Sequence, residues 1–168
     1  NADHLAVIRA QRRRLGTPRG FIVAKPNCSI QSYVPALHPL MDYGVSKLSV
    51  CTYQAVSGAG RTLNTWPEMQ GNIIPFIGGE EEKSEQEPLK IWGSLSPDSN
   101  AIQDSKHPRI SAQCLRVAVE DGHMAAVSVQ FDKKPPRDVI LERWANWTTL
   151  PQQLGLPSAP RPFLIYHE

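Results

Sequence analysis

A cysteine lies between two apolar stretches, in Lys25-Pro26-Asn27-Cys28-Ser29, and this segment is the strongest sign of chemistry in the chain. The run Phe21-Ile22-Val23-Ala24 precedes it, and an amphipathic stretch from Ile30 to Tyr43 follows. This order predicts a strand, a tight turn and a helix that begins at or just after Cys28. Unpaired N–H groups and the positive end of the helix dipole favour a thiolate there. A thiolate is the nucleophile of acyl-transfer and aldehyde chemistry, although many cysteines are simply small buried hydrophobes.

A glutamine and a glycine turn form a second candidate group. Gln54 ends the β-branched and aromatic run 45–56, and its amide can both donate and accept hydrogen bonds to orient a carbonyl or carboxylate. The turn Ser57-Gly58-Ala59-Gly60 follows and would let a ligand approach the backbone closely. A polar strand end and an ordinary turn are the alternative interpretations.

Charged residues form a third group. Glu80 and Lys83 are three residues apart at the acidic start of a predicted helix, so their side chains share a face. A carboxylate and an ammonium group placed in this way can bind an amine and a phosphate, or can form an ion pair with each other. Arg116 lies within an apolar run, where a guanidinium needs an anionic partner from the protein or a ligand. His123 follows a glycine and can transfer protons near neutral pH, although a lone histidine at a turn is often structural.

The elements that position these residues alternate along the chain. Residues 3–15 and 80–91 are predicted helices, although Pro88 can shorten the second, and Pro35 and Pro39 interrupt the helical stretch after Cys28. Residues 94–108 are predicted to be a polar loop, and Pro135-Pro136 opens a further helix. The runs 110–119 and 123–131 read as strands joined in a hairpin by Glu120-Asp121-Gly122. Together these elements predict an α+β fold on a largely antiparallel mixed sheet.

Composition restricts the class of protein. The length of 168 residues suits one domain, residues 1–168. The net charge is only +2, and the one short basic run, Arg12-Arg13-Arg14, lies at a predicted helix end. Both observations disfavour nucleic acid as a partner. The three cysteines are scattered, which argues against disulfides and a zinc site and favours a cytoplasmic location. No apolar run approaches the length of a membrane span, so we expect no membrane partner.

The order of these motifs resembles the aspartate-semialdehyde dehydrogenase family over nearly the whole chain, and its archaeal-type branch in particular. The resemblance rests on the motifs Asn1-Ala2-Asp3-His4-Leu5, Pro26-Asn27-Cys28-Ser29, Tyr53-Gln54-Ala55-Val56-Ser57-Gly58-Ala59-Gly60, Asn72-Ile73-Ile74-Pro75, Glu80-Glu81-Glu82-Lys83, Glu87, Lys90-Ile91, Cys114-Leu115-Arg116-Val117, Gly122-His123 and Leu154-Gly155-Leu156-Pro157-Ser158-Ala159-Pro160. Two positions depart from the family: Lys25 stands where asparagine is more common, and Ile30 where threonine is.

The resemblance implies NADP-dependent reductive dephosphorylation of L-aspartyl 4-phosphate to the semialdehyde, a step toward lysine, methionine and threonine. It also implies helices on one face of the sheet, as in the C-terminal domain of glyceraldehyde-3-phosphate dehydrogenase, and a homodimer or homotetramer. By this resemblance, Cys28 would be the nucleophile, His123 the general acid/base, and Gln54 the residue that orients the substrate. Arg116 would bind the α-carboxylate of the substrate and Glu80 its amino group. Lys83 and Asn27 would contact the phosphate, and Ser57 and Gly58 the cofactor.

Three alternatives remain at this stage. N-acetyl-γ-glutamyl-phosphate reductase uses similar chemistry, but its acetylated substrate offers no free amine to Glu80. A non-catalytic dimerisation module and a cysteine hydrolase are the others. Family members also carry an N-terminal Rossmann-type NADP-binding domain and a C-terminal return helix, which we expect to be absent from this chain, so that it has little activity alone.

Overall fold

The computed structural model describes all residues, 1–168, and divides them into two compact units. Unit 1 contains Asn1–Lys25, Leu89–Lys106 and Pro135–Glu168, and unit 2 contains Pro26–Pro88 and His107–Lys134. None of the helices combines the length and apolar character that crossing a membrane requires. Every candidate site residue named above belongs to unit 2.

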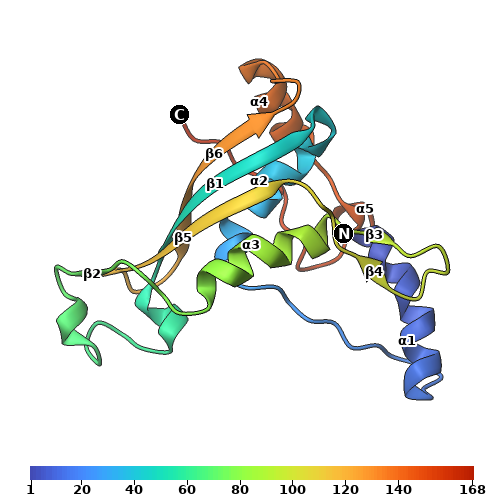
Figure 1. Ribbon diagram of the computed structural model, residues 1–168, viewed down its shortest axis with the longest axis horizontal. Coiled ribbons are helices and arrows are strands. Elements are labelled where there is room, and N and C mark those ends of the chain that lie inside the picture. The colour runs from blue at the N-terminus through green and yellow to red at the C-terminus, as the bar shows by residue number, and fades with distance from the viewer. The chain divides into compact units, whose positions relative to one another are not determined.

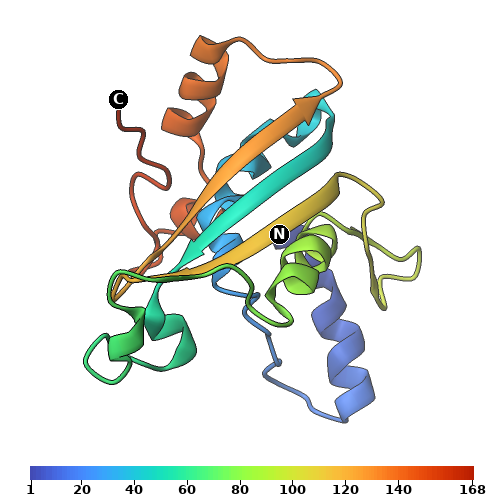
Figure 2. The same ribbon diagram turned by 60° about the vertical axis from the view of Figure 1, so that its left-hand side comes forward.

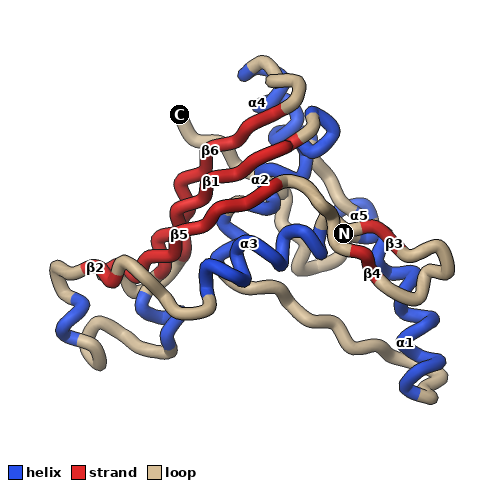
Figure 3. Tube along the Cα trace, viewed as in Figure 1, coloured by secondary structure: helices blue, strands red, loops and turns tan.

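A mixed four-stranded sheet forms the centre of unit 2, in the order β2-β5-β1-β6. Its strands are β1 (Val45–Gln54), β2 (Ile73–Ile74), β5 (Arg109–Val117) and β6 (His123–Phe131). β1 is parallel to β5 and antiparallel to β6, and β2 is antiparallel to the last residues of β5. Figures 1 and 3 show the three long strands side by side, with β2 at one end of β5. The predicted α+β fold with a mixed sheet is confirmed.

The two faces of this sheet differ in burial. Along β1, Leu48, Val50, Thr52 and Gln54 are buried, whereas the residues between them are exposed or half-buried. This period of two is what a strand with one covered face produces. The cover is the chain of short helices that contains α2 (Val34–Leu37), which Figure 2 shows on one side of the strands. Its buried side chains are Ile30, Tyr33, Val34, Leu37 and Leu40. The helices of unit 2 leave the opposite face of the sheet open.

The predicted hairpin between β5 and β6 is wrong, because β1 lies between these two strands. Residues 118–122 are long enough to pass across the end of β1 instead of forming a tight turn. The backbone N–H of Val56 donates to Val119 O at 2.9 Å, and that of Ser57 donates to Glu120 O at 3.2 Å. The crossing therefore leaves β5 and β6 on the two sides of β1.

The strand predicted before the cysteine is also absent. Phe21, Ile22 and Val23 are 53%, 70% and 74% exposed and belong to no strand. Their apolar run lacks the alternation and the neighbouring strand that would make it part of a sheet. Cys28 thus ends a long loop, which Figure 3 shows after α1 (Val7–Leu15).

The predicted interruption of the amphipathic stretch after Cys28 is confirmed. The stretch forms two 3₁₀ helices, η2 (Ser29–Ser32) and η3 (His38–Tyr43), on either side of α2. Pro35 and Pro39 lack the N–H that a continuous helix would need at these positions. The break bends the segment over the sheet, where its apolar side chains are buried.

Helix α3 (Glu80–Ile91) continues through Pro88, so the proline does not shorten it. A proline cannot donate to the carbonyl four residues earlier, which here belongs to Ser84. The hydroxyl of Tyr33 donates to that carbonyl at 2.9 Å and replaces the missing bond. This hydrogen bond therefore connects α3 to the segment that follows Cys28.

The other side of α3 lies along the edge of β5, as Figures 1 and 2 show. β2 pairs with only the last two residues of β5, Arg116 and Val117. Before them, Ala112 N–H donates to Glu85 Oε1 at 3.0 Å, and Cys114 N–H donates to Glu81 Oε1 at 3.3 Å. Two carboxylates thus take the place of a strand at this edge, which protects it from pairing with another chain.

Unit 1 is mainly helical. It contains η1 (Ala2–Ala6), α1, α4 (Arg137–Asn146), α5 (Leu150–Gln153) and the two-residue strands β3 (Ser94–Leu95) and β4 (Ile102–Gln103). The predicted helices at 3–15 and after Pro136 are confirmed, and the predicted loop 94–108 contains the β3–β4 pair. Helix α1 ends at Gly16, whose positive φ of 65° suits glycine.

Candidate active site

Three candidate residues form one row across the sheet. Gln54, the last residue of β1, is paired with Arg116 of β5 on one side and with His123 of β6 on the other. The arrangement depends on the position of β1 between β5 and β6. Residues that are far apart in the sequence thereby present a guanidinium, an amide and an imidazole at one end of the sheet.

The cysteine lies next to the imidazole of this row. Sγ of Cys28 is 3.2 Å from Nε2 of His123, and Cys28 is exposed at the start of η2. Because η2 has only four residues, its dipole contributes little, and the imidazole is the main neighbour that can exchange a proton with the thiol. The predicted position of Cys28 at a helix start is thus confirmed, and His123 lies within hydrogen-bond distance of its sulfur.

The far nitrogen of His123 has a donor and an acceptor beside it. The N–H of Ala55 points at Nδ1 from 3.1 Å, and the carbonyl of Gly122 lies 2.9 Å from the same atom. The donor suits a ring with a lone pair on Nδ1, whereas the carbonyl suits a ring with a proton on Nδ1, either neutral with Nε2 free to accept a proton or protonated on both nitrogens. The backbone can therefore hold the ring in one place in either protonation state.

Glu80, the first residue of α3, is the centre of a polar cluster. Its carboxylate accepts hydrogen bonds from Lys83 Nζ at 3.0 Å, Asn27 Nδ2 at 3.1 and 3.0 Å, and Gln54 Nε2 at 3.3 Å. Burial by itself would raise the pKa of Glu80, but these bonds and the charge of Lys83 outweigh it and lower the pKa. Glu80 is thereby held as a carboxylate beside the segment that contains Asn27 and Cys28.

Asn27 connects this cluster to the cysteine. Its Oδ1 accepts hydrogen bonds from the backbone N–H and the hydroxyl of Ser29, both at 2.8 Å, and its own backbone N–H donates to Glu87 Oε2 at 2.6 Å. Every polar group of its side chain is therefore bound within the protein. Asn27 shapes the loop that carries Cys28, whether or not it also contacts a ligand.

Arg116 is 6% exposed and donates from Nη1 to Ala55 O at 2.8 Å. Burial lowers the pKa of this arginine from its ordinary value, while the nearby carboxylate of Glu80 opposes the effect. A guanidinium has five N–H donors, so this arginine retains donors for a further anion. The sequence-based expectation of a buried arginine that can bind an anion agrees with this environment.

The side chains around Gly58 leave no room for a larger residue at this position. A Cβ on this residue would lie 2.7 Å from Nη1 of Arg116 and 3.1 Å from Cε1 of His123. Ser57 beside it is exposed. The glycine turn therefore makes room for two site side chains and presents its backbone next to them.

The structure brings Cys28, Asn27, Gln54, Gly58, Glu80, Arg116 and His123 together, and Lys83 joins them from an exposed position through Glu80. Ser57 is only adjacent in the chain. Sequence reasoning did not single out Ser29, Ser84 and Glu87 as parts of this arrangement. The spacing of Glu80, Ser84 and Glu87, four and then three residues, places them on one helical face and was the available signal.

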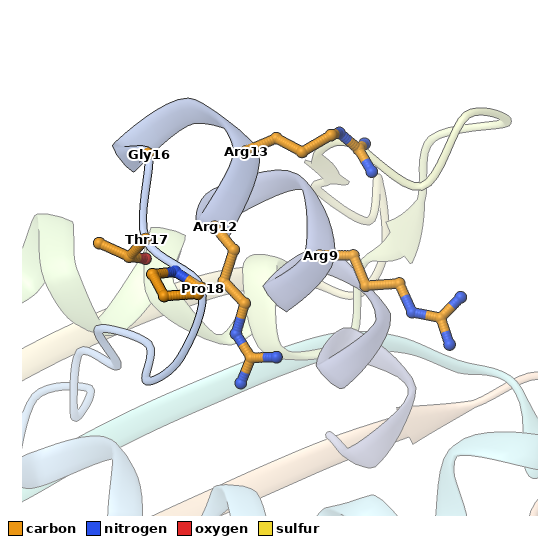
Figure 4. A pocket seen from close by; sticks show the side chains of 6 residues that line it. All are labelled: Arg9, Arg12, Arg13, Gly16, Thr17 and Pro18. Atoms are coloured by element: carbon orange, nitrogen blue, oxygen red, sulfur yellow. The ribbon is translucent and has the colours of Figure 1, made fainter.

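A basic pocket lies elsewhere, at the end of α1, lined by Arg9, Arg12, Arg13, Gly16, Thr17 and Pro18. Arg12 Nε donates to Gly20 O, and Arg13 Nη2 donates to Asn100 Oδ1. Figure 4 shows the three guanidinium groups pointing in different directions. They do not converge on a common point where an anion would bind.

Comparison with known proteins gives a consistent result. Residues 37–153 match the family described as semialdehyde dehydrogenase, dimerisation domain. The chain is 38% identical over 174 residues to the aspartate-semialdehyde dehydrogenase of Cryptococcus neoformans, and 42% identical over 172 residues to that of the archaeon Methanothermobacter thermautotrophicus. In each case the alignment covers 100% of this chain and 48% of the relative.

A solved structure shares the fold. The aspartate-semialdehyde dehydrogenase of Candida albicans, crystallised with NADP, superposes with a TM-score of 0.81 at 30% sequence identity. The superposition covers 95% of this chain and 46% of that protein. The chain thus spans about half the length of the relatives that it matches.

Proposed function

The chain belongs to the family of semialdehyde dehydrogenase dimerisation domains, and from this premise we propose that its protein is an aspartate-semialdehyde dehydrogenase. The reaction would be the NADPH-dependent reductive dephosphorylation of L-aspartyl 4-phosphate to L-aspartate 4-semialdehyde, in lysine, methionine and threonine biosynthesis. The observation that carries this proposal is the contact between Cys28 Sγ and His123 Nε2 beside Glu80 and Arg116.

The nucleophilic step follows from that contact. In the neutral form that carries its proton on Nδ1, against the Gly122 carbonyl, His123 takes the thiol proton on Nε2, and the sulfur of Cys28 attacks the acyl carbon of the substrate. A carbon–sulfur bond forms, the bond from the acyl carbon to the phosphate oxygen breaks, and inorganic phosphate leaves. The Gly122 carbonyl stabilises the protonated ring through Nδ1, which keeps the imidazolium ready to return its proton.

Charged groups around the cysteine fit an amino-acid substrate. Arg116 would bind the α-carboxylate, because a guanidinium matches a carboxylate in shape and charge. Glu80 would bind the amino group, and its contact with Gln54, the longest of its hydrogen bonds at 3.3 Å, would be the first that an ammonium group replaces. Gln54 would then be released to orient the reacting group.

Lys83 and Asn27 would contact the phosphate. Lys83 is exposed, and the hydrogen bond that it donates to Glu80, together with the charge of that carboxylate, raises the pKa of the lysine. It is therefore a cation at neutral pH, as phosphate binding requires. Asn27 would have to exchange one of its bonds to Glu80 for the phosphate oxygen.

The cofactor would meet this chain at Ser57 and Gly58. Ser57 is exposed, and the turn has no side chain at Gly58, so its backbone is accessible next to His123. When bound, NADPH supplies the hydride that reduces the acyl group. We further propose that an N-terminal Rossmann domain, outside this chain, binds the rest of the cofactor, and that a return helix lies outside it too. The chain alone would then have little activity.

The open face of the sheet fits a second copy of the protein. Beside the polar and charged residues Lys47, Arg109, Gln113 and Gln130, it carries small or apolar side chains that are exposed or half-buried, namely Ser49, Cys51, Tyr53, Ser111, Leu115, Met124, Ala126 and Ser128. Such a surface can pack closely against an identical one. We therefore propose a homodimer or homotetramer in which this face forms the contact between subunits. A cytoplasmic location remains a prediction from the scattered cysteines.

The direct test uses the full-length protein with L-aspartate semialdehyde, phosphate and NADP, and follows NADPH formation. N-acetyl-L-glutamate semialdehyde is the matched control substrate, because its amine is blocked and cannot pair with Glu80. We expect phosphate-dependent NADPH formation with the first substrate and little with the second. The opposite preference would assign the protein to the alternative reductase, and activity with neither would contradict the proposal.

A further inference from the structure

The loop that carries the nucleophile lacks regular structure of its own. No strand precedes Cys28, and only the four-residue helix η2 follows it. His123, in contrast, is part of a hydrogen-bonded strand. The 3.2 Å distance between the two side chains therefore depends on whatever fixes the loop relative to the sheet.

The contacts of the loop lead to one face of α3. Glu80 accepts from the side chain of Asn27, and Glu87 accepts from its backbone N–H at 2.6 Å. Between these two carboxylates, Ser84 contacts the hydroxyl of Ser29 at 3.3 Å, and its carbonyl accepts from Tyr33. Since the spacing is four and three residues, these three helix positions lie in one row along the loop.

The adjacent face of α3 is fastened to the sheet. Glu81 and Glu85 accept the N–H groups of Cys114 and Ala112 in β5, and the Ser84 hydroxyl lies 3.5 Å from Sγ of Cys114. The helix therefore connects the nucleophile loop with the strand next to β1. It transmits the position of the sheet, and so of His123, to Cys28.

We propose that Glu87 is a positioning residue for the nucleophile. Its carboxylate holds the peptide N–H of Asn27, one residue before Cys28, and is two helical turns from Glu80. The two carboxylates fix the backbone and the side chain of Asn27 at separate points, which prevents the loop from rotating. The inference rests on the proposed role of Cys28 as nucleophile, and it gives Glu87 a function that requires no contact with substrate.

The test compares Glu87→Ala with Glu87→Gln in the full-length protein. An amide oxygen can still accept the Asn27 N–H, whereas a methyl group cannot. Glu82→Ala is the matched control, because Glu82 is an exposed carboxylate on the same helix. The readouts are kcat, KM for aspartate semialdehyde, and the rate at which iodoacetamide alkylates Cys28 at pH 7, resolved by peptide mass spectrometry.

We expect Glu87→Ala to lower kcat and the Cys28 alkylation rate by about tenfold or more with little change in KM, because a small misplacement of a reacting group is costly. Glu87→Gln and Glu82→Ala should stay within about twofold of the parent protein. Should Glu87→Ala not fold, Glu87→Asp, which withdraws the carboxylate by one methylene, is expected to change both rates in the same direction.

The proposal is overturned if folded Glu87→Ala, or Glu87→Asp in its place, keeps both rates, or if Glu87→Gln is as impaired as the alanine variant. Alkylation of Cys28 requires neither substrate nor cofactor. It therefore still tests the positioning role if the protein proves to catalyse a different reaction.

Discussion

Cys28 Sγ and His123 Nε2 lie 3.2 Å apart although 95 positions separate the two residues in the chain. The histidine is the first residue of β6, and the cysteine lies outside the sheet at the start of η2. Two separate features bring them together: the position of β1 between β5 and β6, and the attachment of the cysteine loop to α3.

The general acid/base role of His123 predicts a loss in two independent measurements. His123→Gln removes a group that can exchange the thiol proton, so we expect kcat to fall by about 10²–10⁴-fold. Alkylation of Cys28 by iodoacetamide at pH 7 should slow as well, because the side chain that can take the thiol proton is missing. Normal alkylation together with lost turnover would instead assign His123 to a later step.

A pair of glycine variants separates crowding at the site from strain in the turn. Gly58→Ala would place a methyl group 2.7 Å from Nη1 of Arg116, which is buried and bonded to Ala55 O, so that kcat/KM should fall about tenfold or more. Gly60→Ala meets no atom within 4 Å, but Gly60 has a φ of +68°. It should therefore cost about 1–2 kcal/mol of stability and leave kcat/KM nearly unchanged.

These two variants are distinguished by urea unfolding combined with steady-state kinetics. If Gly58→Ala retained full activity, the close contact of this turn with Arg116 and His123 would not be needed for catalysis.

The proline in α3 makes a prediction about stability. Tyr33→Phe would leave the buried Ser84 carbonyl without a partner, because Pro88 has no N–H to replace the lost hydroxyl. We expect the free energy of unfolding to fall by about 1–3 kcal/mol. A change of less than about 0.5 kcal/mol would contradict this role of the Tyr33 hydroxyl.

Glu80 predicts a dependence of stability on pH. Because its hydrogen bonds lower its pKa in the folded state below the ordinary value of 4.5, the folded state binds fewer protons than the unfolded state in acid. The stabilisation is therefore fully present above that ordinary value and is lost as the pH falls through the folded-state pKa. The stability difference between the parent protein and Glu80→Gln should be larger at pH 7 than at pH 3.

Denaturant titrations at the two pH values measure this difference, with Glu82→Gln as the exposed control on the same helix. A difference for Glu80→Gln that stays constant or grows on acidification would contradict the assigned bonds.

Residue chemistry and local patterns predicted much of this structure. The β-branched and aromatic residues of the run 45–56 predicted β1, and the acidic start at Glu80 predicted α3. The apolar setting of Arg116 predicted a buried guanidinium, and the segment around Cys28 predicted a cysteine near a helix start. Each of these features depends on neighbours in sequence, which a single chain displays.

Features that depend on distant partners were not predicted. The hairpin signal at Glu120-Asp121-Gly122 could not show that β1 enters between β5 and β6. The sequence left open whether Pro88 shortens α3, because the hydroxyl that replaces its N–H comes from Tyr33, 55 positions earlier. The hydrogen bond from the Asn27 N–H to Glu87 joins residues 60 positions apart, and the sequence alone did not predict it.

The most direct measurement is the mass of the Cys28 peptide after the full-length protein is mixed with L-aspartyl 4-phosphate in the absence of cofactor. Without hydride the reaction should stop at the acyl-enzyme. The account predicts an aspartyl thioester on Cys28 and one phosphate released per acylated chain. It predicts no adduct on Cys51 or Cys114, and no thioester in the Cys28→Ser variant. An unmodified Cys28, or an adduct on another cysteine, would contradict the assignment of Cys28 as the nucleophile.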